Sequence, residues 1–142
     1  MDKIEHIGIA VRDLFAANET YRKLLGVAHY KMEMVESEKV NTSFFQAGEN
    51  KIELLESTDP DGVIAKFIEK KSEGIHHIAF AVEDIRKEMK RLKAEGFLLL
   101  NEEPKRGADN KLVCFVHPMN VNGVLIELCE EIKSLRNTEG NP

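Results

Sequence analysis

The 142-residue sequence has no tryptophan, only two cysteines and no apolar run longer than a strand. Its longest apolar segments, such as IGIAV and HIAFAV, are far shorter than the roughly 20 residues that span a bilayer. Cys114 and Cys129 lie in strand-like segments without the spacing of a metal motif. We interpret both as reduced core thiols, and we expect no membrane segment and no disulfide framework.

A positively charged surface is also missing, because the formal charge at pH 7 is -5. One predicted helix does carry several basic residues, but acidic residues interrupt them: Lys87, Glu88, Lys90, Arg91, Lys93 and Glu95. Such a mixture is typical of a solvated helix face, so we expect no nucleic-acid partner. The first strand-like segment begins within three residues of Met1, which leaves no room for a leader; we therefore expect a cytoplasmic location.

What the sequence does contain is an internal repeat. Residues 4–14 read IEHIGIAVRDL and residues 75–85 read IHHIAFAVEDI, which places His6 over His77 at an offset of 77 - 6 = 71 residues. Each copy runs into an amphipathic helix with an aspartate before it and a glycine after it, as helix caps require. Each then closes on a matching strand, which places Glu53 in KIELLE over Glu127 in LIELCE.

The repeat predicts an α+β domain over residues 1–132, built from two tandem βαβββ modules. Module one covers residues 1–58 and module two covers 74–132. Between them, residues 59–73 form a connector helix with an apolar side. The polar residues 133–142 are predicted to form a flexible tail.

The two histidines fall on the less bulky face of their strands. Every second side chain of a strand shares a face, so His6 lies with Gly8 and Ala10, whereas the intervening isoleucines pack under the helix. The second copy repeats this arrangement around His77. By the same alternation, His76 takes the opposite face, and we interpret it as a packing residue or as a residue that supports a metal ligand without binding the metal.

We predict that His6, Glu53, His77 and Glu127 meet at one divalent metal ion. A single histidine in an apolar strand is more often a hydrogen-bonded core residue than a ligand. However, all four residues recur in pairs, and two buried carboxylates without a cation would be costly to desolvate. Two imidazoles and two carboxylates suit Co, Zn, Ni, Mn or Fe, and the sequence does not choose among these metals.

These paired units resemble the vicinal-oxygen-chelate (glyoxalase/bleomycin-resistance/dioxygenase) superfamily. Within it, the second half is similar to the methylmalonyl-CoA epimerases, through GIHHIAFAVEDI at 74–85, EEPKRGADNK at 102–111 and FVHPMNVNGVLIEL at 115–128. The segment DGVIAKFIEKK resembles their inter-module helix, so the resemblance covers residues 4–130. It implies a cupped, mostly antiparallel sheet around the metal site, a homodimer and a CoA thioester substrate.

The resemblance also implies chemistry, namely inversion of the carbon between a carboxylate and a thioester by removal and return of its proton. Glu127 would serve as one acid/base and Glu53, or a water, as the other. Some epimerases carry a glutamate near Thr42, where threonine cannot replace it, and many have glutamine at the position of Glu53. The loop EPKRGADNK has the composition of a substrate-facing turn, so Lys105, Arg106 and Lys111 are candidate substrate-binding residues, with His117 beyond them; solvent-exposed turns are the alternative.

The metal ligands alone fit other reactions equally well. A lactoylglutathione lyase would use the same four residues, and an Fe(II) ring-cleaving dioxygenase would need two histidines and one carboxylate. A metal-free, drug-binding resistance module of the same fold is the non-enzymatic alternative.

Overall fold

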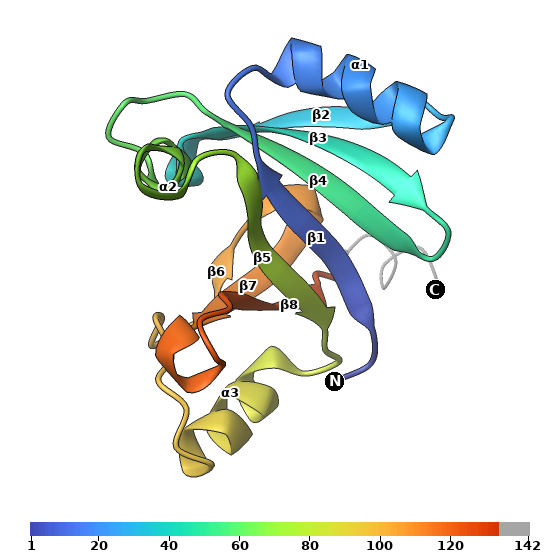
Figure 1. The fold of residues 1–142 in the computed structure, drawn as a ribbon. Coiled ribbons are helices and arrows are strands. Elements are labelled where there is room, and N and C mark those ends of the chain that lie inside the picture. The colour runs from blue at the N-terminus through green and yellow to red at the C-terminus, as the bar shows by residue number, and fades with distance from the viewer. Residues whose placement is uncertain (134–142) are drawn as a thin grey trace, which may run out of the picture.

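The computed structural model describes residues 1–133, and Figure 1 shows them as one strongly curved sheet with the first and third helices along its outer side. The first half contains β1 (Ile4–Ala10), α1 (Leu14–Leu25), β2 (Lys31–Val35), β3 (Val40–Ala47) and β4 (Asn50–Ser57). After α2 (Val63–Lys71), the second half contains β5 (Gly74–Ala81), α3 (Ile85–Ala94), β6 (Lys105–Arg106), β7 (Lys111–Val116) and β8 (Ile126–Glu131). Three short 3-10 turns complete the order: η1 (Glu36–Glu38), η2 (Ala108–Asn110) and η3 (Pro118–Asn120). The predicted α+β class with two βαβββ units is confirmed.

The sheet has eight strands in the order β2-β3-β4-β1-β5-β8-β7-β6. Within each half, the first strand runs parallel to the last, so that β1 pairs with β4 and β5 pairs with β8. The other five pairings are antiparallel, including the β1–β5 pair that joins the two halves. The sheet is therefore mostly antiparallel, as predicted, and the two repeated strands lie side by side at its centre.

α1 begins and ends where the sequence predicts, and α3 begins there but ends at Ala94, two residues before Gly96; α2 is shorter than the predicted connector 59–73. The Asp13 side chain accepts a hydrogen bond from the amide of Ala16, and Asp84 accepts one from Lys87. Gly26 ends α1 with a φ of 78°, which a glycine adopts without steric cost. The bulky strand faces pack under these helices in two apolar clusters, one around Leu14 and the other around Ile85.

Two β-bulges interrupt the central β1–β5 pair. Gly8 lies opposite His77 while Ile9 lies opposite Ile75, which leaves His76 as an extra residue on β5. A second shift, between Ile4 and His6, makes Glu5 the extra residue on β1. Because a bulge breaks the strict alternation of side chains, His76 does not lie on the face that the sequence assigns to it.

Among the described residues, no helix is long and apolar enough to cross a membrane. Cys114 and Cys129 are buried and unbonded, as expected for core thiols. The predicted tail lies outside the described residues apart from Lys133.

Candidate active site

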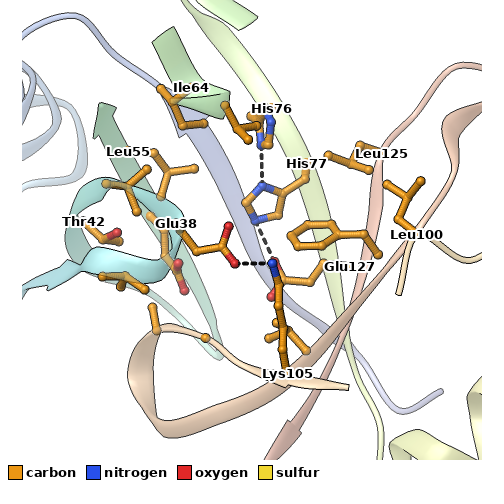
Figure 2. A pocket seen from close by; sticks show the side chains of 18 of the residues that line it. Glu38, Thr42, Leu55, Ile64, His76, His77, Leu100, Lys105, Leu125 and Glu127 are labelled. Atoms are coloured by element: carbon orange, nitrogen blue, oxygen red, sulfur yellow. Dashed lines mark hydrogen bonds and ion pairs between the residues drawn. The ribbon is translucent and has the colours of Figure 1, made fainter. Parts of the chain in front are cut away.

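A cavity of about 310 Å³ lies between the two halves, against the inner face of the sheet. Most of its wall is apolar, from residues such as Leu55, Ile64 and Leu125. Figure 2 shows these side chains together with the ionisable groups that enter the cavity. The ionisable residues of the wall come from both halves: Glu38, Glu53, His76, His77, Lys105 and Glu127.

Three donor atoms converge at this wall. The Nε2 atoms of His6 and His77 lie 3.0 Å apart, and Oε1 of Glu127 lies 2.9 Å from His77 Nε2 and 3.4 Å from His6 Nε2. The β1–β5 register brings the histidines together, because His77 lies opposite Gly8. A Cβ atom on residue 8 would overlap the His77 imidazole, so only glycine leaves room for that ring.

These three atoms fit a divalent cation. Ligand atoms about 2.1 Å from a metal are about 3.0 to 3.4 Å from one another at octahedral or tetrahedral angles. His6, His77 and Glu127 are also buried and can offer one ligand atom each. Two imidazoles and a carboxylate are a donor set for first-row transition metals or zinc. The described residues therefore include a candidate metal centre where the sequence predicts one.

Glu53 does not join these three atoms. Its Oε2 lies 3.1 Å from Nδ1 of His6, which is the other nitrogen of the same ring. The carboxylate is buried and still lines the cavity. Burial raises the pKa of Glu53 to about 7, and the negative charge of Glu127 adds to this effect against the pull of His6. The structure thus brings three of the four predicted ligands together and places the fourth behind them.

The cluster carries an excess of buried negative charge around His6. Burial opposes protonation of this imidazole, but Glu53, Glu127 and Glu5 together raise the pKa of His6 to about 10. Burial would likewise raise the pKa of Glu127, yet contacts with His6 and His77 hold it well below its usual range. Carboxylates in a buried site need a positive charge nearby. A proton on His6 provides one, and a divalent cation would provide two.

The bulge residues contact the two histidines from behind. Oε1 of Glu5 lies 2.8 Å from Nδ1 of His6, and Nδ1 of His76 lies 2.9 Å from Nδ1 of His77. The expectation that His76 takes the opposite face is therefore wrong, because the bulge turns its ring into the cavity wall. There it also packs edge-on against Phe67 of α2, with ring centroids 5.0 Å apart. Burial lowers the pKa of His76 to about 4, so its ring is neutral at neutral pH.

Sequence reasoning missed Glu5, although the repeat places it over His76. Glu5 begins a chain of ion pairs that leads away from the site. Its Oε2 lies 3.2 Å from Lys51 Nζ, and that nitrogen donates to Oδ2 of Asp109 at 2.9 Å. Lys31 Nζ donates to the other carboxylate oxygen of Asp109 at 2.5 Å. Strands β2 and β4 of the first half are thereby tied to the loop around η2 in the second.

Of the four predicted substrate-binding residues, Lys105 alone lines the cavity among the described side chains. Arg106 is exposed to solvent next to it. Lys111 turns toward Asp109, with 3.6 Å between Nζ and Oδ2. Nδ1 of His117 accepts a hydrogen bond from the amide of Met119, which is a structural contact within a turn.

Glu38 is a further cavity residue that sequence reasoning missed. It ends the η1 turn, directly before Lys39 in the left-handed conformation, and its Oε1 lies 2.6 Å from Nζ of Lys105. Thr42, the position at which some epimerases carry a glutamate, also faces the cavity. Its hydroxyl is buried and has no hydrogen-bond partner.

Comparison with known proteins places the chain in a family. Residues 5–115 match the glyoxalase/bleomycin resistance protein/dioxygenase superfamily. The chain belongs to this superfamily. Among its members, the ethylmalonyl-CoA/methylmalonyl-CoA epimerase of Cereibacter sphaeroides is 41% identical over 128 residues, which cover 89% of this chain and 96% of the relative.

Two solved superfamily structures have the same fold. A variant of Streptomyces coelicolor methylmalonyl-CoA epimerase, in complex with 2-nitronate-propionyl-CoA, superposes with a TM-score of 0.90 at 33% identity, covering 94% of this chain and 99% of that one. Methylmalonyl-CoA epimerase from Mycobacterium tuberculosis gives a TM-score of 0.89 at 34% identity, covering 95% and 91%. The likeness therefore extends over nearly the whole of each chain.

Proposed function

We propose that the protein is an epimerase that interconverts the (R) and (S) forms of methylmalonyl-CoA with one divalent metal ion. The observation that carries the proposal is the position of Glu127, whose carboxylate lies among the convergent imidazole nitrogens at the cavity wall. Epimerases that share up to 41% identity with nearly the whole chain support the choice of reaction. The same metal ligands would otherwise fit a lactoylglutathione lyase.

The reaction must remove a proton from a carbon between a carboxylate and a thioester. Its main difficulty is the negative charge that develops on the thioester oxygen as the proton leaves. A divalent ion such as Co, Zn, Ni, Mn or Fe would supply Lewis-acid stabilisation of that charge. We assign its binding to His6, His77 and Glu127; Glu53, the fourth predicted ligand, would join them by turning from Nδ1 of His6 toward the ion.

The chain's own residues can bind the substrate and move the proton. Contacts with His6 and His77 hold the pKa of Glu127 well below its usual range, so its carboxylate is ionised but weakly basic, and it would depend on the metal ion to make the α-proton more acidic. Lys105 offers a positive charge to the substrate carboxylate at the cavity wall. The apolar wall around Leu55 and Ile64 excludes water and matches the α-methyl group.

The proposal is tested by following the α-proton of methylmalonyl-CoA by NMR in deuterated water, with and without a chelator. We expect exchange that requires metal, and Glu127→Gln should lower its rate by about 10²- to 10⁴-fold, the usual contribution of a general base. Glu131→Gln, at the exposed end of the same strand, is the matched control. Exchange that is absent in the metal-loaded protein would exclude the epimerase.

The same preparation separates the alternative functions. Turnover of the glutathione hemithioacetal of methylglyoxal would favour a lactoylglutathione lyase, and a protein that neither binds metal nor turns over either substrate would favour the resistance module. The resemblance further implies a homodimer, which we propose as the assembly. Light scattering coupled to size-exclusion chromatography tests it, since a monomer mass at micromolar concentration would contradict a stable dimer.

A further inference from the structure

The proposed reaction needs two acid/base groups, and Glu127 is only one of them. Inversion requires that a proton leave one face of the flat enolate and that another arrive on the opposite face. One carboxylate reaches one face only. A partner for Glu127 must therefore be an ionisable side chain of the same cavity that enters from another direction.

Few side chains of the cavity wall meet this requirement. His77 and Glu127 belong to the convergent donor atoms, and Glu53 is held against His6 Nδ1. The ring of His76 contacts Nδ1 of His77, whereas Glu127 contacts Nε2 of the same ring. Thr42 has no ionisable group at neutral pH. Glu38 and its ion-pair partner Lys105 are what remains of the ionisable wall.

Glu38 and Glu127 reach the cavity from different halves of the protein. Glu38 is presented by η1, between β2 and β3, whereas Glu127 belongs to β8 of the second half. Figure 2 shows both carboxylates among the side chains that line the cavity, with Lys105 joined to Glu38. Carboxylates that enter a cavity from two separate elements can face the two sides of a flat molecule bound between them.

We propose that Glu38 is the second acid/base of this protein. The assignment rests on the proposed epimerase function. In one direction, Glu127 takes the α-proton and the C–H electron pair moves onto the thioester oxygen. Protonated Glu38 then gives its proton to the other face of the α-carbon, so that a new C–H bond forms with inverted configuration. Glu38 ends as a carboxylate and Glu127 as a carboxylic acid, and the reverse direction exchanges these roles.

Lys105 links this step to substrate binding. In the structure without substrate, its ammonium lies 2.6 Å from the Glu38 carboxylate. A substrate carboxylate that attracts the same ammonium weakens this ion pair and leaves the Glu38 side chain free to turn toward the bound substrate. Lys105 is therefore a positioning residue for Glu38.

The test measures α-proton exchange separately for the two stereoisomers, and inversion by circular dichroism. With wild-type protein, both stereoisomers should exchange and invert. Glu38→Gln should lower inversion by about 10²- to 10⁴-fold. The Glu38→Gln variant should still exchange the α-proton of the stereoisomer that Glu127 deprotonates. The Glu127→Gln variant should exchange the α-proton of the other stereoisomer instead. Wild-type protein that exchanges neither stereoisomer would contradict the proposed function itself, which keeps the two failures distinct.

Three variants separate catalysis from structure. Glu36→Gln alters an exposed carboxylate of the same turn and should leave both stereoisomers unaffected. Lys105→Met removes the ion pair but keeps the Glu38 carboxylate, so both stereoisomers should retain exchange at lower affinity. Glu53→Gln retains an oxygen ligand and should slow both alike. The assignment would be overturned if Glu53→Gln lost exchange of one stereoisomer only. It would also be overturned if Glu38→Gln, with normal folding and metal content, lost exchange of both stereoisomers equally.

Discussion

Each of the two site histidines is contacted at its Nδ1 atom by the residue that precedes it in the sequence. Glu5 approaches Nδ1 of His6, and His76 approaches Nδ1 of His77. A hydrogen bond at Nδ1 fixes both the tautomer and the orientation of an imidazole, and thereby directs Nε2 toward the other ligands. The two contacts differ in charge, because Glu5 offers a carboxylate to His6 whereas His76 offers an uncharged ring to His77.

Glu5 should therefore control metal affinity without touching the metal. Removal of such a supporting contact typically costs 10- to 100-fold in affinity. We expect Glu5→Gln to weaken Zn²⁺ or Co²⁺ binding by about that factor, measured by isothermal titration calorimetry. Glu49→Gln, an exposed side chain of the β3–β4 turn, is the control. Equal affinities for wild-type protein and Glu5→Gln would show that the Glu5–His6 contact has no role in binding.

At this scale the sequence predicts the paired residues but not their neighbours. His6, His77 and Glu127 meet because they recur in the repeat and share the inner face of the sheet. Glu5 and His76 could not be placed, because alternation assigns them to the other face and an extra bulge residue leaves no signal in the pattern. Glu38 does not belong to the repeated segments, and its position depends on the path of a short turn.

Among the elements, the loop that contains η2 is anchored by ion pairs to three strands. Asp109 interacts with Lys31 on β2, Lys51 on β4 and Lys111 at the start of β7. Its φ of 58° lies in the left-handed region, which asparagine and aspartate tolerate better than most residues. Gly107 and Ala108 of the same loop line the cavity, so Asp109 holds part of the cavity wall in place from outside.

Asp109 should contribute stability that depends on pH. Burial alone would raise its pKa, but hydrogen bonds from Lys31 and Lys51 lower the pKa to about 2. Because the folded-state pKa lies below the unfolded value of about 4, the contribution is complete above pH 4 and is lost as the pH falls toward 2. We expect Asp109→Asn to lower the free energy of unfolding by about 1 kcal/mol at pH 7, after allowance for solvent screening.

Urea denaturation at several pH values measures this difference. The gap between wild-type protein and Asp109→Asn should be constant from pH 7 to pH 5 and should shrink between pH 4 and pH 2. A gap that does not change over that range would mean that the lysine contacts do not stabilise the folded state. Asp61→Asn, in the exposed turn before α2, should show no such trend.

The sequence predicts helices and strands more fully than it predicts these links. Capping aspartates and glycines mark both long helices, and the apolar periods of the strands match the faces that pack under them. The ion pairs of Asp109 join residues 58 and 78 positions apart. No local pattern contains that information, because each partner alone has the composition of an ordinary exposed charge.

At the scale of the whole molecule, the site exists only where the two halves meet. β1 contributes His6, whereas β5 and β8 contribute His77 and Glu127. The repeated strands form the centre of one continuous sheet, so equivalent residues of the two halves approach each other across that pair. Differences between equivalent residues, such as Glu5 against His76, then make a nearly symmetric scaffold into an asymmetric site.

A cation bound at this junction should stabilise the fold as a whole. Its ligands come together only in the folded chain, so binding raises the free energy of unfolding by about 2.7 kcal/mol when the free metal is at 100 times its Kd. For a domain of this size, each kcal/mol changes the melting temperature by about 3 °C. We therefore expect differential scanning calorimetry to show a decrease of about 8 °C when a chelator removes the metal. His77→Asn should melt at the same temperature with and without metal, because it lacks the nitrogen ligand that joins His6 and Glu127; an equal response of this variant and the wild-type protein would locate the stabilising ion elsewhere.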